Sequence, residues 1–194
     1  MVFAGKTIGW GFCGSHHSMP LILPYVRKAR DEGAEIIPVV SRTLATTETK
    51  HGRPEDWLGA LEEVTGRRPL LEIPEVEPFG PDRICDLVML APCTGSSLAR
   101  FANAITDSAP LMAAKSQLRN GRPVLVSITT NDALGLNAKN LATLLNMRNV
   151  YFVPFGQDSP QSKPTSLVAH LDLLIRAMEA ALEGRQLQPL LQAW

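Results

Sequence analysis

The chain has 194 residues, of which 45% are hydrophobic, and its 19 basic and 19 acidic residues give a formal net charge of zero. This length and apolar content predict one domain over residues 1–194, and the even charge balance argues against nucleic acid or an anionic membrane as a partner. No apolar run reaches the roughly 20 residues that span a bilayer, and no signal-peptide pattern opens the chain, so we expect a cytoplasmic protein.

A strand-like run over Thr7–Phe12 opens the chain and breaks at Gly14 and Ser15. A helix is expected from about Pro24 to just before Gly33, followed by a continuous apolar strand over Glu35–Val40. Together they form a βαβ unit. Its first turn has the order strand, glycine turn and helix, which gives free backbone N–H groups for a phosphate.

Gly9, Gly11 and Gly14 also match the G-x-G-x-x-G dinucleotide pattern. An NAD site requires an acidic residue at the end of the second strand, where this chain has Ser41 and Arg42. NAD is therefore disfavoured, NADP depends on Arg42 alone, and FMN, with a single phosphate, fits more easily. A tight turn without a ligand is the remaining alternative.

The next segments predict a loop, a helix and an extended connection. Residues 42–53 are polar and follow a strand end, as expected for a mobile flap over a crevice. Residues 54–64 predict a helix that ends before Gly66, and the proline-rich residues 70–83 predict an extended connection.

A second strand-to-turn unit follows at residues 85–97. Residues 85–91 predict a buried strand, residues 92–97 (PCTGSS) a turn of small and hydroxyl side chains, and residues 98–104 a helix. Because the carboxyl ends of parallel strands share one edge of a sheet, the two turns should bracket one ligand.

The rest of the chain predicts further strand and helix pairs. We expect a helix capped by Asp107 or Ser108 and ended by Gly121, a strand over residues 123–128, a polar loop over 129–137, and a helix to about Met147. A strand over 150–154, an active-edge or exposed loop over 155–164 and a long helix over 165–183 complete the prediction. The fold class is thus α/β, a three-layer doubly wound parallel sheet of Rossmann or flavodoxin type.

The three cysteines, Cys13, Cys85 and Cys93, show no C-x-x-C or Cys/His spacing. This spacing argues against both a zinc site and a disulfide framework, so reduced thiols and no metal are expected.

Six segments carry a resemblance to the flavoprotein family of FMN-binding cysteine decarboxylases. They are residues 9–15 (GWGFCGS), 38–41 (PVVS), 91–97 (APCTGSS), 106–115 (TDSAPLMAAK), 130–137 (TNDALGLN) and 153–158 (VPFGQD). The resemblance implies a doubly wound sheet, an FMN crevice and a homo-oligomer of three or more subunits. One branch of the family implies a different activity: oxidation of a dihydrodipicolinate precursor to dipicolinic acid in sporulating bacteria. Its partner would be the Rossmann-type dehydrogenase that forms the A subunit of dipicolinate synthase.

The resemblance also implies the cofactor contacts. Gly14 and Ser15 would lie at the flavin phosphate, Ser41 near the phosphate or ribityl chain, and residues 94–97 along the flavin. The full expected set is Gly11, Cys13, Gly14, Ser15, His16, Ser41, Arg42, Pro92, Thr94, Gly95, Ser96, Ser97, Thr129 and Asn131.

The chain departs from the decarboxylases at three points. Ser96 stands where they have asparagine, residues 129–137 replace their substrate loop, and their catalytic histidine has no clear counterpart. Decarboxylation is therefore not expected. The candidates for acid–base catalysis are His16, His17 and His51, and the candidates for binding a dicarboxylate substrate are Arg42, Lys50, Arg53 and Lys115. Two alternatives to the oxidoreductase subunit stay open: a non-catalytic partner that stabilises the dehydrogenase, and an NADP-binding reductase.

Overall fold

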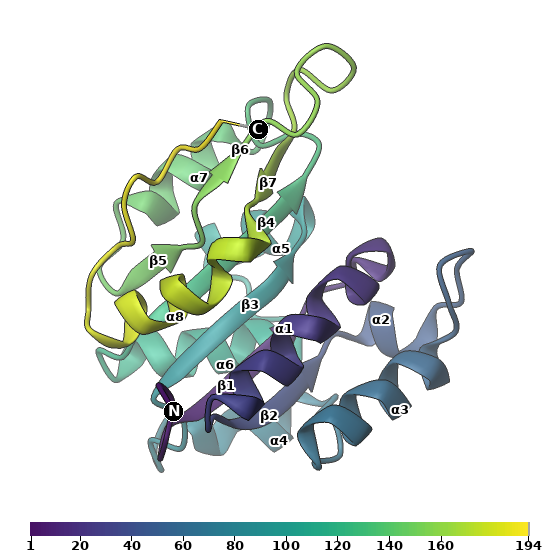
Figure 1. The fold of residues 1–194 in the computed structure, drawn as a ribbon, viewed down its shortest axis with the longest axis vertical. Coiled ribbons are helices and arrows are strands. Elements are labelled where there is room, and N and C mark those ends of the chain that lie inside the picture. Colours follow the sequence, from purple (N-terminus) through teal and green to yellow (C-terminus); the bar gives the residue numbers. More distant parts are fainter. Residues whose placement is uncertain (194) are drawn as a thin grey trace.

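The computed structural model describes residues 1–193. The chain forms a seven-stranded sheet that is covered by helices on both faces (Figure 1). The strands are β1 (Thr7–Phe12), β2 (Glu35–Val40), β3 (Leu87–Cys93), β4 (Val124–Thr130), β5 (Val150–Phe152), β6 (Phe155–Gly156) and β7 (Leu167–Ala169). The α-helices are α1 (Met19–Asp31), α2 (Arg42–Thr46), α3 (Pro54–Thr65), α4 (Ile73–Val76), α5 (Gly95–Ala102), α6 (Ala109–Arg119), α7 (Ala138–Leu145) and α8 (Leu174–Leu182). Short 3-10 turns are η1 (His16–Ser18), η2 (Glu77–Phe79) and η3 (Leu171–Leu173).

The parallel strands follow the order β2-β1-β3-β4-β5, which is the flavodoxin-like order. This confirms the predicted fold class. The chain moves from β1 outward to β2 and then back past β1 to β3, so the direction of winding reverses between β1 and β3. Ligands of open α/β sheets bind at the carboxyl ends of the strands at this switch point.

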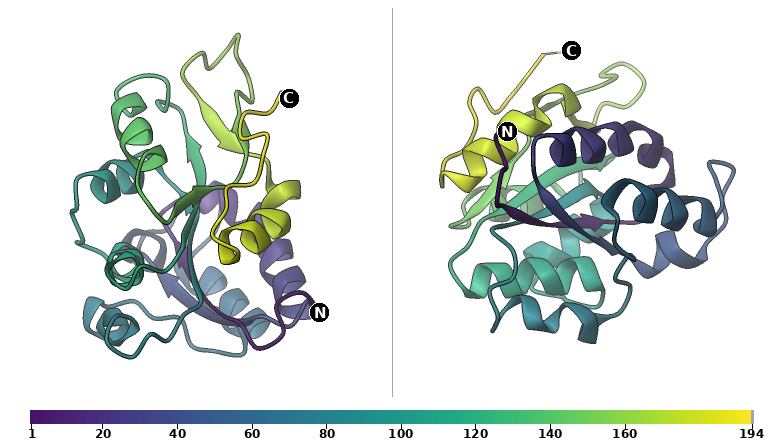
Figure 2. Two further views of the ribbon diagram at one scale, coloured as in Figure 1. Left: turned by 90° about the vertical axis from the view of Figure 1, so that its left-hand side faces the viewer. Right: turned by 60° about the horizontal axis from the view of Figure 1, so that its bottom comes forward.

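Helices cover both faces of the sheet (Figure 2), and the two faces of β1 carry different residue types for a packing reason. Ile8, Trp10 and Phe12 are fully buried and pack in one core with α1, α3 and α8. On the other face, a Cβ at Gly11 would lie 2.9 Å from the Met89 carbonyl oxygen and 3.0 Å from the Pro110 side chain of α6. Gly11 therefore allows α6 to pack closely on the sheet, and Gly9 does the same for Phe79 of η2.

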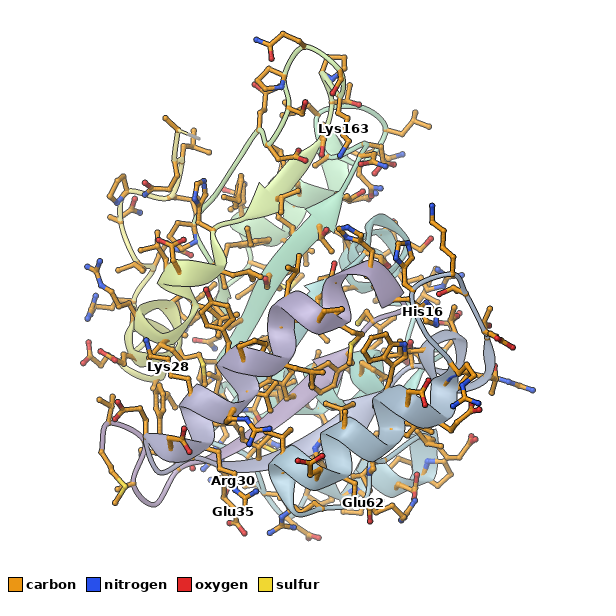
Figure 3. All side chains as sticks on the ribbon, turned by 45° about the vertical axis from the view of Figure 1, so that its right-hand side comes forward. His16, Lys28, Arg30, Glu35, Glu62 and Lys163 are labelled. Carbon is orange, nitrogen blue, oxygen red and sulfur yellow. The ribbon has the colours of Figure 1, made fainter. Side chains whose placement is uncertain are left out.

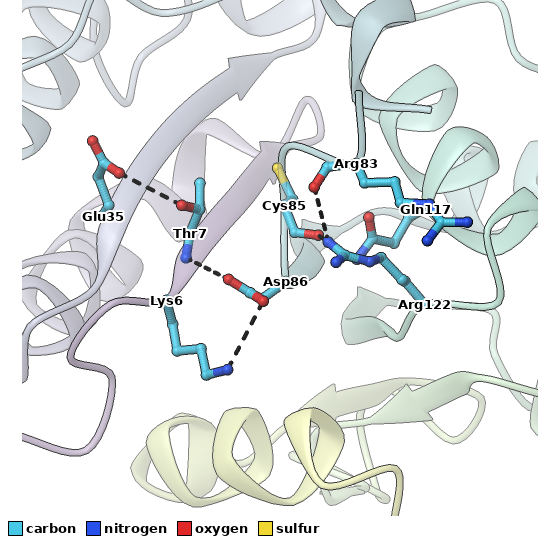
Figure 4. Close-up of polar contacts among 8 residues, drawn as sticks. All are labelled: Lys6, Thr7, Glu35, Arg83, Cys85, Asp86, Gln117 and Arg122. Carbon is cyan, nitrogen blue, oxygen red and sulfur yellow. Dashed lines mark hydrogen bonds and ion pairs between the residues drawn. The ribbon is translucent and has the colours of Figure 1, made fainter. Parts of the chain in front are cut away.

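Polar contacts hold β1 to β3 at the amino ends of the strands, away from the switch point (Figure 4). The Asp86 carboxylate accepts a 2.9 Å hydrogen bond from Thr7 N and lies 3.9 Å from Lys6 Nζ. Beside it, the Gln117 side chain donates to the Cys85 carbonyl at 3.2 Å. These contacts fix the relative register of β1 and β3 before the two strands reach the site.

Helix α1 begins at Met19, so the prediction of a start near Pro24 was wrong. Pro20 lies in the first turn, where its missing N–H is not needed, and Pro24 lies inside the helix. Burial of Met19, Ile22 and Val26 outweighs the one backbone hydrogen bond that Pro24 removes.

Two segments expected to lack helices contain them. Residues 70–83 form α4 and η2, because Pro74 and Pro78 occupy first-turn positions and Glu75 completes a capping box with Glu72. Residues 42–53 begin with α2, capped by Ser41.

The prediction of one long helix over residues 165–183 was also wrong. Its first part is strand β7, in which Leu167 pairs with Thr130 of β4, and α8 begins only at Leu174. Phe155 and Gly156, expected in an exposed loop, are buried in β6 and pair antiparallel with β7. Within residues 1–193, no helix is long and apolar enough to cross a membrane.

Candidate functional site

Three turns meet at the carboxyl edge of the sheet. The Cys13 N–H after β1 donates to the Pro92 carbonyl of β3 at 3.1 Å, and the Gly14 N–H donates to Ser41 Oγ after β2 at 3.0 Å. Gly14 has φ +48°, a conformation that favours glycine. The glycine turn therefore lies directly between the two neighbouring strand ends.

Two of these turns lead directly into helix N-termini. Thr94 caps α5, because its Oγ1 accepts from Ser97 N at 3.3 Å, and Ser41 Oγ likewise accepts from Leu44 N of α2 at 3.5 Å. The cap at Thr94 starts α5 three residues earlier than the predicted Leu98. First-turn N–H groups have no acceptor inside their own helix, so both helices offer donors to an anion.

A polar cavity of about 410 Å³ lies between these turns. Arg42 and Arg100 contribute guanidinium groups, and Arg100 Nε is 3.0 Å from Asp107 Oδ2. Hydroxyl, N–H and guanidinium donors together suit a phosphate. The full lining is Gly14, Ser41, Arg42, Thr43, Thr94, Ser96, Ser97, Arg100, Asp107, Ser108 and Leu111.

A larger cavity of about 580 Å³ lies on the other side of the glycine turn, toward β4 and β7. Its walls combine apolar side chains from α1 and η3 with polar groups from the end of β4. The lining residues are Ser15, His17, Ser18, Leu21, Ile22, Pro92, Ser127, Ile128, Thr129, Thr130, Asn131, Asp158, Lys163, Val168, Ala169 and Leu171. Such a mixed wall suits a flat ring with polar substituents.

Gly95 is the point at which α5 contacts the loop after β4. A Cβ at this position would lie 2.5 Å from Thr130 Oγ1, 2.8 Å from Asp132 Oδ1 and 3.0 Å from Asn137 Nδ2. Asp132 accepts hydrogen bonds from both Thr130 and Asn137, and Asn140 donates to Asn137 at 2.8 Å. This network packs against Gly95 and so determines how closely the α5 N-terminus approaches the end of β4.

The cysteines are not activated for chemistry, and only two of them lie near the site: Cys13 and Cys93 are at the carboxyl ends of β1 and β3, whereas Cys85 precedes β3. Cys13, Cys85 and Cys93 are free and buried. Burial raises the pKa of Cys13 and of Cys85 to about 12, and it raises the pKa of Cys93 well above 9.0. The Ser97 side chain hydrogen-bonds the Cys13 thiol and offsets only part of this effect. Thiols in this state are poor nucleophiles at neutral pH.

The three candidate histidines occupy different environments. His16 is buried in η1, just before α1 (Figure 3), and its Nε2 has no hydrogen-bond partner among residues 1–193. His17 is exposed and lines the larger cavity. His51 contacts His17 edge-to-face, with ring centroids 5.2 Å apart. Of the three, His17 therefore has direct access to a ligand in a cavity.

The structure brings most of the expected cofactor residues to the two cavities. Gly14, Ser41, Arg42, Thr94, Ser96 and Ser97 line the smaller cavity, and Ser15, Pro92, Thr129 and Asn131 line the larger one. Gly11, Cys13 and His16 line neither, and Gly95 faces the Asp132 network.

The expected cations are less well placed, since Arg42 is the one among them that lines either of these two cavities. Arg53 pairs with Asp56 at 2.9 Å and Glu55 at 3.3 Å, while Lys50 and Lys115 are exposed away from both cavities. Sequence reasoning missed Arg100, whose position four residues after Ser96 puts it on the same helix face, and Lys163, for which the sequence carries no local signal.

Comparison with known proteins gives one curated relative and several solved structures. No family model matches the chain. The chain is 46% identical to the dipicolinate synthase B subunit of Bacillus subtilis (strain 168) over 187 residues, 96% of this chain and 94% of the relative. The crystal structure of the dipicolinate synthase B subunit from Bacillus halodurans is 47% identical and superposes with a TM-score of 0.92, covering 100% of this chain and 99% of that one. The FMN-dependent cysteine decarboxylase SpaF shares the fold at 18% identity and a TM-score of 0.65, covering 93% of this chain and 97% of its own.

Proposed function

The chain belongs to the family of dipicolinate synthase B subunits, and from that membership we propose that it supports oxidation of dihydrodipicolinate to dipicolinic acid around a bound FMN. The A subunit of dipicolinate synthase is the proposed partner, and sporulation in the cytoplasm the proposed setting. The observation that carries the FMN proposal is the meeting of the turns after β1, β2 and β3 at the switch point, where they form a donor-rich cavity.

The donor set of the smaller cavity fits the phosphate of FMN. Ser41, Thr94 and Ser96 present hydroxyl groups there, and the first turns of α2 and α5 present backbone N–H groups. The Arg42 and Arg100 side chains balance part of the charge of a phosphate dianion. We assign the phosphate and ribityl end to this cavity.

The larger cavity supplies the environment for chemistry on a ring. Leu21, Ile22 and Leu171 form an apolar wall, which excludes water from the face of a bound ring, and Thr129 and Asn131 orient its polar edge. FMN, when bound, supplies a two-electron acceptor for the hydride that leaves the dihydropyridine. His17, at the wall of this cavity, is the residue that we propose takes the ring proton.

Peptidyl-cysteine decarboxylation is not part of the proposal. The chain has Ser96 at the position of the decarboxylase asparagine, and none of its buried thiols is activated. By resemblance to the flavoprotein family we further propose a homo-oligomer of three or more subunits.

Absorption spectroscopy tests the FMN proposal. The purified protein should be yellow, or should perturb the FMN spectrum on titration with saturation at one FMN per chain, and added dihydrodipicolinate should bleach the flavin band. A protein that binds no FMN contradicts this proposal.

Two further assays separate the alternatives. Increased activity of the dehydrogenase partner without flavin binding would identify a non-catalytic role. Binding of NADPH, abolished by Arg42→Ala, would identify the reductase, because Arg42 lies at the end of β2 where a 2′-phosphate would bind.

A further inference from the structure

Lys163 is the cationic anchor available in the larger cavity. Of the described residues that line this cavity, Lys163 is the one lysine, and none is an arginine. It lies on the hairpin that joins β6 to β7, which projects beyond the carboxyl edge of the sheet (Figure 3). The hairpin therefore places a basic side chain at a cavity whose other titratable residues are Asp158 and His17.

Internal contacts hold this hairpin in shape. Lys163 N donates to the Ser159 carbonyl at 2.7 Å, and Ser166 N donates to the Lys163 carbonyl at 3.1 Å. Lys163 Nζ lies 3.3 Å from Asp158 Oδ2, while Asp158 Oδ1 accepts from Ser166 Oγ at 2.8 Å. The Lys163 ammonium group is thus oriented by one carboxylate oxygen.

Asp158 is fixed as an anion by the same contacts. Burial opposes its ionisation, but hydrogen bonds from Ser166 and Lys163 outweigh burial and keep the pKa of Asp158 below its ordinary value. An ammonium group has three N–H donors, and Asp158 engages one of them. The Lys163 side chain is 51% exposed, so its remaining donors are accessible to a ligand.

Other residues that line the cavity supply neutral groups beside this charge. Thr129, Thr130 and Asn131 place hydroxyl and amide groups at the end of β4, and Leu21 and Leu171 add an apolar surface. A flat ring between the apolar side chains would extend one polar substituent toward Lys163 and another toward the end of β4. Pyridine-2,6-dicarboxylate and its dihydro precursor have this arrangement of groups.

We propose that the larger cavity binds a dihydropyridine or pyridine dicarboxylate and that Lys163, positioned by Asp158, recognises one of its two carboxylates. This inference rests on the proposed function for the class of substrate. It replaces Arg42, Lys50, Arg53 and Lys115 as the recognition residues, since only Arg42 lines a cavity, and that is the smaller one.

Isothermal titration with pyridine-2,6-dicarboxylate tests the inference. Lys163→Met retains the side-chain length but removes the charge, and a lost charge-assisted hydrogen bond should weaken binding roughly tenfold or more. Lys163→Arg should retain most of the affinity. Lys115→Met, which removes an exposed lysine outside both cavities, is the matched control and should bind like the unaltered protein.

Pyridine-2-carboxylate provides a second measurement. The unaltered protein should prefer the dicarboxylate, and Lys163→Met should lose most of this preference because the second carboxylate no longer has a partner. Urea unfolding establishes that each variant is folded. We expect Lys163→Met to fold, because Lys163 is an exposed residue of the hairpin.

The outcomes separate this inference from the FMN proposal. If the protein binds FMN but not the dicarboxylate, or if Lys163→Met binds the dicarboxylate as tightly as Lys115→Met does, the inference is wrong and the FMN proposal stands. If dicarboxylate binding depends on Lys163 while FMN does not bind, the FMN proposal fails and the inference stands.

Discussion

The hydroxyl oxygen of Ser41 accepts hydrogen bonds from Gly14 N at 3.0 Å and from Leu44 N at 3.5 Å. One side chain thus joins the glycine turn after β1 to the first turn of α2. Ser41→Ala should lower the free energy of unfolding by about 1–2 kcal/mol, because it removes both a cap and a partner of a partly buried N–H.

Urea unfolding and FMN titration measure the effect of Ser41→Ala. The matched control is Thr46→Ala on the same helix, which removes only an exposed hydroxyl that donates to the Arg42 carbonyl. The control should change stability by less than about 0.5 kcal/mol. Equal effects of the two substitutions would show that Ser41 has no special role at the turn.

Gly95→Ala should be destabilising, because the added Cβ would lie 2.5 Å from Thr130 Oγ1 and 2.8 Å from Asp132 Oδ1. We expect a loss of roughly 1–3 kcal/mol and weaker FMN binding. Gly59→Ala is the control: Gly59 is an exposed position of α3 with no atom within 4 Å of its ideal Cβ. This change should stabilise the protein by up to about 1 kcal/mol. A neutral Gly95→Ala in thermal unfolding would contradict the close packing described above.

Trp10→Phe should cost roughly 2–4 kcal/mol of stability. The fully buried Trp10 indole donates to the Ala91 carbonyl at 2.8 Å, so the substitution leaves a buried acceptor unpaired and removes core volume. Trp57→Phe is the comparison, because the Trp57 indole N–H has no hydrogen-bond partner among the described residues. Its half-buried ring should cost only about 1 kcal/mol. A larger loss for Trp57→Phe in urea unfolding would reverse this assignment.

Glu75 should contribute stability at neutral pH that disappears in acid. Hydrogen bonds from Arg68 and from the backbone of Glu72 and Leu71 lower the pKa of Glu75 from 4.5 to about 2. A carboxyl whose folded pKa is lowered stabilises the fold above its unfolded pKa, and the contribution is lost as the pH falls from about 4.5 toward 2.

Comparison of Glu75→Gln with the unaltered protein measures this contribution. With screening at the exposed Arg68, Glu75→Gln should lose about 1–2 kcal/mol at pH 7, and the difference should shrink below pH 4.5. Glu62→Gln, at an exposed position of α3, is the control and should show no such trend. A Glu75→Gln difference that stayed constant down to pH 3 would contradict the lowered pKa.

The parallel strands and the turns after β1 and β3 could be predicted from the sequence. Each is an apolar run bounded by glycine or small polar residues, and parallel order brings the ends of such runs together. The expected residues at Gly14, Ser41 and Thr94 line one cavity for this reason.

Other elements depend on tertiary contacts that local sequence does not encode. Leu167 and Leu171 share a helical spacing with Leu174, but pairing with the end of β4 draws Leu167 into β7. The place of Lys163 at a cavity follows from the same pairing, since β7 fixes the base of the hairpin that carries it. The prolines of α1 led to the opposite error, because they predicted a later helix start than the structure has. Burial of the helix outweighs their local effect.

Strand β4 has two partners along the same edge: parallel β5 pairs with residues 124–126, and antiparallel β7 pairs with Thr129 and Thr130. The hairpin is therefore anchored to the sheet by two residue pairs between β7 and β4, and Thr165 adds hydrogen bonds to the Asn131 carbonyl and from Leu134 N in the loop after β4. Insertions or deletions between Gln157 and Ser166 could reshape the rim of the larger cavity without shifting the five parallel strands. Evolution could in this way exchange one ligand for another while leaving the inherited scaffold untouched.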